Sequence, residues 1–148
     1  MVDLVLVTAP SRKKVYQGLS DDLAAIEPPV WSGLIAQYLY TRNYNVVILD
    51  AEAEQLDHKE TAEKIIEYNP TLVCFSIYGQ QPSASTQCMP GAIKTCNLLN
   101  DLSDFKYETI AIGTHPSALP NRTLRDGPFN FVGKGECLST MEYLIEFI

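Results

Sequence analysis

A run of small and amide-bearing residues, YGQQPSAST at 78–86, is the segment best suited to hold a polar ligand. It directly follows the apolar run TLVCFSI at 71–77 and carries no charged side chain. Its neutral donors and acceptors suit a large ligand with amide groups. A simpler alternative is that Ser85 or Thr86 caps the following helix. The candidate contacts in this segment are Tyr78, Gly79, Gln80, Gln81, Ser83, Ser85 and Thr86.

A second candidate segment is GTHPSALP at 113–120, where the chain must pass close to any ligand beyond a strand end. His115 could bind a metal or relay protons, although a lone histidine is more often satisfied by ordinary hydrogen bonds. The segment contributes Gly113, Thr114, His115, Pro116 and Ser117 to the candidate site.

A third candidate segment is GKGE at 133–136, a two-glycine turn that leads into the last predicted helix. The N-terminal amides of a helix can meet an anion or a polar group of a ligand. Glu136 could instead simply favour the helix dipole. The residues concerned are Gly133, Lys134, Gly135 and Glu136.

Five short β-rich runs precede or separate these segments, and most are continuously apolar rather than alternating. That pattern is typical of strands buried on both faces, as in a parallel sheet covered by helices. The predicted strands are 2–8, 45–50, 71–77, 107–113 and 129–133.

Helical candidates lie between the strands, at 28–43, 57–69, about 87–102 and 136–147. In the first, a stripe at three- and four-residue spacing predicts a core-facing side formed by Trp31, Leu34, Ile35, Tyr38 and Leu39. The segment at 115–127 predicts a short helix at best, because Pro116, Pro120 and Gly127 interrupt it.

The alternation of strands and helices predicts an α/β fold, a doubly wound, Rossmann-like or flavodoxin-like parallel sheet of five strands in the order 2-1-3-4-5, with helices on both faces. Ligands of such sheets bind beyond the carboxyl ends of the strands, at the switch point between strands one and three. The long first loop, which begins at Ala9 and Pro10, therefore joins the candidate site.

Composition excludes several function classes. The net charge of −7 and the pI near 4.7 argue against phosphate neutralisation, so we expect no nucleic-acid partner. The chain lacks the glycine patterns of NAD and ATP sites, its four cysteines lack metal-site spacing, and no apolar run is long enough for a bilayer. We expect one domain, 1–148, a cytoplasmic location, no membrane partner and no resident metal site.

Taken together, several motifs resemble the N-terminal cobalamin-binding domain of cobalamin-dependent radical SAM enzymes, a group dominated by methyltransferases. The resemblance spans nearly the whole chain. Its specific motifs are YGQQPSAST and GTHPSALP, and suggestive ones are the EPP entry to the first helix (Glu27, Pro28, Pro29, Gly33, Leu34), QYL at 37–39, VVILDA at 46–51 and VGKGE at 132–136.

The resemblance implies cobalamin as the cofactor, in a base-off, His-off form, because positions 9–27 lack the histidine that supplies a lower cobalt ligand in methionine-synthase-type domains. It places 78–81 beneath the corrin, and the serines with 113–118 and 133–136 along the groove for the nucleotide tail. The family's Ser-x-Leu motif matches Ser76, Ile77 and Tyr78. Its paired glycines match Ile112 and Gly113, where Ile112 departs from the pattern.

A radical SAM half would need a CxxxCxxC motif for a [4Fe–4S] cluster, and this chain has none. S-adenosylmethionine and the cluster would then belong to a C-terminal or separate radical SAM domain, so the chain alone would carry no catalytic residue. The apolar ending LIEFI favours a truncated or excised domain.

The sequence leaves two alternatives from other functional classes open. One is a receiver-like interaction or sensor module without a cofactor. Receivers need an acidic cluster after the first strand and a phosphoacceptor Asp at the end of the third strand. In this chain those positions hold Thr8 to Ser11 and Ser76 to Gly79, which disfavours phosphoacceptor chemistry. The other is a flavodoxin-like domain that binds FMN or a nucleotide, which TAPSRKK after the first strand fits poorly.

Overall fold

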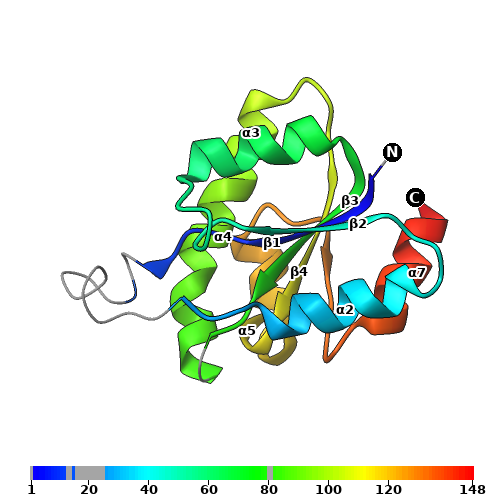
Figure 1. The fold of residues 1–148 in the computed structure, drawn as a ribbon. Coiled ribbons are helices and arrows are strands. Elements are labelled where there is room, and N and C mark those ends of the chain that lie inside the picture. Colours follow the sequence, from blue (N-terminus) through cyan, green and yellow to red (C-terminus); the bar gives the residue numbers. More distant parts are fainter. Residues whose placement is uncertain (1, 13–14, 16–25, 80–81) are drawn as a thin grey trace.

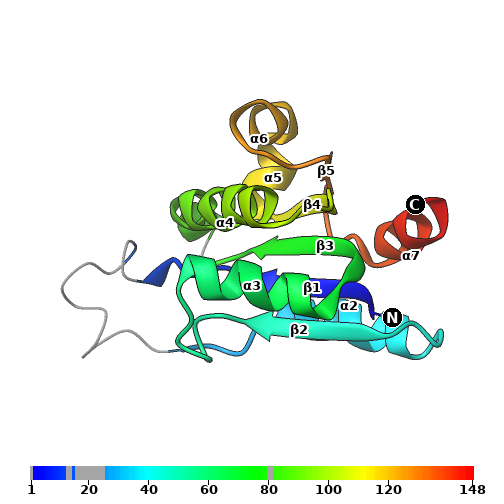
Figure 2. The ribbon, with the colours of Figure 1, turned by 90° about the horizontal axis from the view of Figure 1, so that it is seen from above.

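The computed structural model describes residues 2–12, 15, 26–79 and 82–148. In this part of the chain five parallel strands form one sheet in the order β2-β1-β3-β4-β5, as predicted. Figure 2 shows β2, β1, β3 and β4 side by side in that order. The strands are β1 (Val2–Thr8), β2 (Val46–Asp50), β3 (Pro70–Ile77), β4 (Glu108–Gly113) and β5 (Phe131–Val132).

Helices cover both faces of the sheet, and Figure 1 shows α3 on one side with α2 and α7 on the other. Two apolar layers separate them from the strands, because continuous apolar strands place side chains on both faces. The helices are α2 (Val30–Tyr40), α3 (His58–Tyr68), α4 (Pro82–Leu102), α5 (Thr114–Ala118), α6 (Pro120–Asp126) and α7 (Leu138–Phe147).

The α3/α4 cluster is the larger layer and contains Val5, Val7, Val73, Phe75, Ala62, Ile65, Met89 and Leu99 among others. The α2/α7 cluster lies on the opposite face and contains Leu4, Leu6, Leu72, Cys74, Ile110, Ile112, Ile35, Leu39, Cys137 and Met141. All four cysteines are free thiols, as predicted, and Cys74 is fully buried in β3.

Local signals explain where α3 begins and ends. The Asp57 carboxylate accepts the amides of Lys59 and Glu60, each at 2.8 Å, and the Glu60 carboxylate accepts the Asp57 amide at 2.8 Å. This reciprocal capping box satisfies amides that would otherwise lack partners. Asn69 ends the helix in the left-handed conformation, with φ of 45°.

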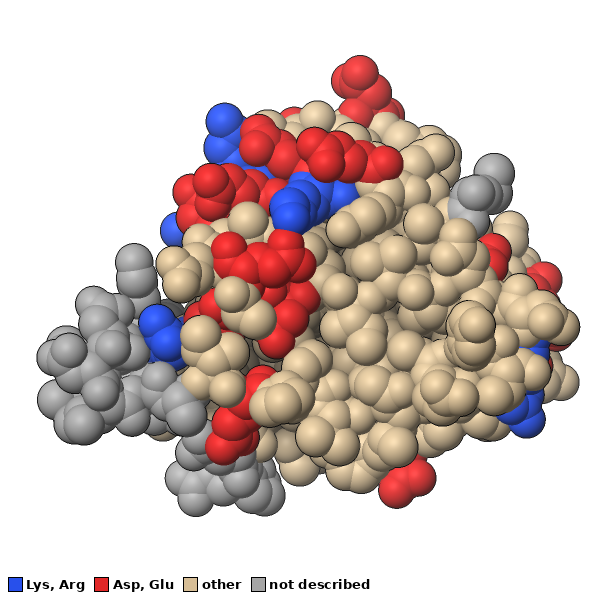
Figure 3. Space-filling view, viewed as in Figure 1, with Lys and Arg blue, Asp and Glu red and all other residues tan. Residues whose placement is uncertain are grey.

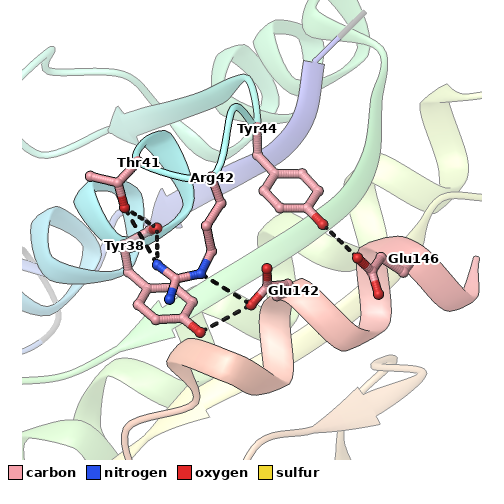
Figure 4. A network of polar contacts seen from close by, with 6 residues as sticks. All are labelled: Tyr38, Thr41, Arg42, Tyr44, Glu142 and Glu146. Carbon is pink, nitrogen blue, oxygen red and sulfur yellow. Dashed lines mark hydrogen bonds and ion pairs between the residues drawn. The ribbon is translucent and has the colours of Figure 1, made fainter.

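A polar contact network joins the end of α2 and the residues that follow it to α7 (Figure 4). The Tyr38 hydroxyl donates to Glu142 at 3.0 Å, and the Arg42 guanidinium lies 3.4 Å from the same carboxylate and 3.6 Å from the Tyr38 ring centroid. The Tyr44 hydroxyl donates to Glu146 at 3.0 Å. The two tyrosine contacts join residues that are 104 and 102 positions apart in the chain.

The predicted start of the helix after β3 was wrong by five residues. This helix begins at Pro82 rather than near 87, so Ser83, Ser85 and Thr86 lie in its first turns and not in a loop. Proline is well suited to the first helical position, because its fixed φ is helical and its missing amide needs no partner there.

The prediction that the helix at 115–127 is short and interrupted is confirmed, except that Pro116 does not break a helix. Pro116 lies inside α5 and Pro120 begins α6, so two short helices replace one interrupted segment. Near a helix start the missing proline amide breaks no helical hydrogen bond. Gly127 does end the second helix, as expected.

The predicted core-facing stripe of the first helix was partly wrong. Ser32, Ile35 and Leu39 are its buried residues, whereas Trp31 is 37% exposed and Leu34 is 49% exposed. The helix is therefore rotated so that Trp31 faces away from the core. The spacing of its apolar residues did not reveal this rotation.

Candidate functional site

A cavity of about 360 Å³ lies at the carboxyl edge of the sheet, at the predicted switch point between β1 and β3. Strand ends, the start of α2 and the start of α4 all contribute to it. Its described lining comprises Thr8, Ser11, Arg12, Val15, Ile26, Glu27, Pro28, Pro29, Val30, Trp31, Asp50, Glu52, Ser76, Tyr78, Gly79, Ala84 and Cys88. Cavities of about 300–1,000 Å³ hold drug-sized ligands, so this one can take part of a larger cofactor.

One wall of the cavity is aromatic. The rings of Trp31 and Tyr78 stack with centroids 5.5 Å apart and planes inclined by 22°. Tyr78 also packs against the α2/α7 cluster, and burial raises its pKa to about 12. The phenol is therefore neutral at physiological pH and presents a flat, uncharged surface.

Another part of the lining is acidic and hydrogen-bonded. One Glu52 oxygen accepts hydrogen bonds from the backbone amides of Ser11 and Arg12, the latter at 2.6 Å. These two bonds hold the start of the long loop after β1. One Asp50 oxygen accepts the amides of Glu52 and Ala53, each at 3.2 Å. Burial raises the pKa of Asp50 despite these bonds.

Figure 3 shows the wider charge pattern of this side of the molecule, where acidic side chains gather over the α3 region. Neutral residues cover most of the face below and to the right of them, and few lysine or arginine side chains are visible. This distribution agrees with the net charge of −7 and offers no basic stripe on this face.

Ser85 is a structural joint rather than a free ligand contact. Its side chain is fully buried, its hydroxyl donates to the Ile77 carbonyl, and it accepts the His115 amide at 3.0 Å. One hydroxyl therefore connects the end of β3, the first turn of α4 and the start of α5.

Gly113 lies at the same joint. Its φ is 138°, and a side chain there would place a Cβ only 2.0 Å from the Ile77 carbonyl oxygen. Only glycine accommodates both the backbone conformation and this close approach. Ile112, at the position of the family's first paired glycine, is fully buried in the α2/α7 cluster.

His115 is hydrogen-bonded rather than placed in a metal site. Its Nδ1 lies 2.9 Å from the Thr86 hydroxyl, and burial together with the nearby Arg122 lowers its pKa. No group of three or more His, Cys, Asp or Glu side chains within the described residues is placed to hold a metal ion. This is the simpler of the two roles considered for His115.

The two downstream candidate segments lie next to each other. The Gly135 amide donates to the Ser117 hydroxyl at 3.0 Å, and Gly135 has φ of 82° with open space where a Cβ would be. Gly133 is buried, and a Cβ there would lie 2.5 Å from the Cys137 sulfur. Lys134, Glu136 and Thr114 are exposed, Pro116 is buried, and Ser117 is half-buried.

Only some of the predicted site residues line the cavity. Ser76, Tyr78 and Gly79 line the cavity, and Ala9 lines a smaller pocket that shares Thr8, Ser76 and Tyr78 with it. Pro10 lines neither, and its carbonyl lies close to Gly91 of α4. The groups at 113–117 and 133–136 contact each other but do not line this cavity. Gln80 and Gln81 lie outside the described residues.

Sequence reasoning missed Trp31, Asp50 and Glu52 as lining residues. The usable signal for Trp31 was its place at the first turn of the helix that follows the switch-point loop. The two carboxylates follow β2, whose carboxyl end neighbours that of β1 in the sheet.

The comparison with known families gives one match. The sequence model described as "B12 binding domain" matches residues 17–144. The chain belongs to this family. Cobalamin is accordingly the cofactor of the family, and the match favours it over a receiver-like or FMN-binding domain. A search of curated proteins found no match.

Solved structures confirm the fold expected of a B12-binding domain. The radical S-adenosylmethionine methyltransferase TsrM from Kitasatospora setae, with tryptophan and a SAM analogue bound, aligns over 99% of this chain and 25% of its own, with a TM-score of 0.74 and 15% identity. TsrM with cobalamin and a [4Fe-4S] cluster gives a TM-score of 0.68 and 16% identity over the same shares. The chain therefore spans about a quarter of the TsrM length.

Features of the described site fit a cobalamin-type ligand. The cavity offers an aromatic wall for a flat apolar ring and carboxylates that can accept amide N–H groups. None of the described helices is long and apolar enough to cross a bilayer.

Proposed function

We propose that this B12-binding domain holds cobalamin in a base-off, His-off form, as the cofactor domain of a radical SAM enzyme of the methyltransferase type. The family match over residues 17–144, with a cavity at the sheet edge, is the observation that carries the proposal. When bound, cobalamin would supply a methyl group for transfer to a substrate radical formed elsewhere.

The chain's two histidines support the His-off part of this proposal. They are His58 and His115, and neither lies in the loop after β1. His58 Nδ1 lies 2.9 Å from the Thr95 hydroxyl, and His115 is engaged with Thr86. Both imidazoles are thus held by hydrogen bonds away from the cavity lining.

The residues proposed to hold the cofactor are those of the sequence motifs that meet at the sheet edge. Ser76, Tyr78 and Gly79, with Gln80 and Gln81, would contact the corrin side, and Ser83 and Thr86 would lie beside them. The nucleotide tail would follow the adjacent segments 113–117 and 133–136, where Gly135 leaves open space. Ser85 would act by holding these segments together rather than by touching the ligand.

The radical chemistry is proposed to come from another domain or chain. The TsrM structures carry a SAM analogue in one case and a [4Fe-4S] cluster in the other, and this chain aligns with only a quarter of that protein. A C-terminal or separate radical SAM domain would supply S-adenosylmethionine and the cluster. We further propose a cytoplasmic location, which suits an oxygen-sensitive cluster and four free thiols.

An absorbance titration with hydroxocobalamin, followed by desalting, tests the proposal. We expect stoichiometric retention and a base-off spectrum. After reduction to Co(II), the electron paramagnetic resonance spectrum should lack nitrogen superhyperfine splitting, because neither a histidine nor the cofactor's own base coordinates cobalt. Loss of all cobalamin on desalting from a folded protein contradicts the binding, and nitrogen splitting contradicts the His-off, base-off form.

A further inference from the structure

Trp31 of α2 is partly exposed, whereas Ser32, Ile35 and Leu39 of the same helix are buried. It lies in the first turn of the helix, next to the fully buried Ser32, yet its own side chain is 37% exposed. It is the only tryptophan of the chain. A large aromatic side chain left partly exposed at a cavity wall is a common feature of ligand sites.

The stack between Trp31 and Tyr78 joins the start of α2 to the segment that follows β3. Tyr78 follows β3 and is anchored on the α2/α7 cluster, so its ring has little freedom. Trp31 lies against that ring at 5.5 Å and 22°. Both side chains line the cavity, so the pair forms one continuous aromatic surface there.

The same cavity is also lined by the polar residues Asp50 and Glu52, which carry carboxylates. A ligand with a flat apolar ring and peripheral amides can use both, since the aromatic faces accept the ring and the carboxylates accept amide N–H groups. The cavity thus offers complementary contacts to a planar, amide-bearing ligand.

We propose that Trp31 packs directly against the bound cobalamin and, with Tyr78, fixes the position of the cofactor in the cavity. This inference rests on the proposed function and adds a residue of α2 that the strand-end motifs do not include. Trp31 acts here as a positioning residue and takes no part in bond making.

Affinity measurements on matched variants test the role of Trp31. We expect Trp31→Ala to weaken hydroxocobalamin binding at least 10-fold, and Trp31→Phe, which keeps a flat ring, to stay within about 3-fold of the wild type. Leu34→Ala is the control, because Leu34 lies on the same helix, is 49% exposed and does not line the cavity. It should change the affinity less than 2-fold.

Hydroxyl-radical footprinting of the wild-type chain gives a readout of contact that needs no substitution. Bound cobalamin should protect Trp31 from oxidation, while Tyr40 of the same helix, which is 72% exposed and outside the cavity, keeps its rate. Equal rates for Trp31 with and without cofactor overturn direct contact.

The outcomes separate this inference from the function on which it rests. If the wild-type chain retains cobalamin and Trp31→Ala binds it equally well, the role of Trp31 is wrong and the proposed function stands. If the wild-type chain retains none, both are wrong. The melting temperatures of the cofactor-free variants show whether each is folded. If Trp31→Ala is not folded, protection of Trp31 in the wild-type footprint decides the question.

Discussion

At the scale of single residues, one glycine and one serine occupy positions with specific structural constraints. Gly113 is required by the approach of the Ile77 carbonyl and by its own backbone conformation. Ser32 is the reverse case, a buried hydroxyl without a partner among the described residues. A buried, unpaired hydroxyl is unfavourable for folding.

Replacing Gly113 by alanine should lower the free energy of unfolding by at least about 2 kcal/mol, since a positive φ and a severe steric contact each destabilise the fold. Urea denaturation measures the change. Gly33→Ala is the matched control, because a Cβ at Gly33 of α2 meets nothing within 4 Å. Alanine there should be neutral or stabilising by up to about 1 kcal/mol. Equal stabilities for the two variants would contradict this account.

At the scale of elements, the sequence located the strands better than the helix starts. Continuous apolar runs mark buried parallel strands directly, and the carboxyl ends of β1 and β3 follow from the order of strands and helices. Pro82 and the small residues after it are equally compatible with a loop and with a first helical turn. Their assignment depends on the tertiary hydrogen bonds of Ser85, which the sequence does not reveal.

The candidate site was predictable from the sequence at the strand ends but not at the start of α2. Ser76, Tyr78 and Gly79 follow a strand that ends at the switch point, so their presence in the cavity follows from topology. Trp31 was assigned to the core because apolar spacing alone cannot distinguish a core face from a cavity wall. That distinction depends on the rotation of α2, which Ile35 and Leu39 fix by packing on the sheet.

The joint formed by Ser85 predicts a measurable loss when its hydroxyl is removed. Ser85→Ala leaves the Ile77 carbonyl and the His115 amide without this partner, so we expect a loss of about 1–3 kcal/mol in the free energy of unfolding. Ser83→Ala, at an exposed position in the same turn, should change it by less than about 0.5 kcal/mol. A loss for Ser85→Ala no larger than for Ser83→Ala would show that the joint contributes little.

At the scale of the whole molecule, the histidines determine how stability depends on pH just below neutrality. Burial is the main cause that lowers the pKa of both His58 and His115 from 6.5. The unfolded chain therefore binds protons more readily than the folded one, and stability falls as the pH drops below about 6.5. Hydrogen bonds lower the pKa values of Asp57 and Asp126, so these two carboxylates affect stability only at more acidic pH.

The double variant His58→Gln, His115→Gln should therefore lose less thermal stability than the wild type between pH 7 and pH 5.5. Glutamine can still bond Thr95 and Thr86 but takes up no proton in this range. Melting temperatures across the range measure the difference. Parallel curves for the two proteins would assign the acid sensitivity to other groups.

The central place of β1 has a consequence for synthesis on the ribosome. This strand pairs with β2 on one side and β3 on the other, and Leu4, Val5, Leu6 and Val7 are fully buried between two layers of helices. Residues 46–50 emerge only after β1, and residues 70–77 later still. At roughly 5–20 residues per second, the nascent strand stays unpaired for about 2–15 s. A run of four bare apolar residues exposed for that long is a natural target for chaperones that hold unfinished chains.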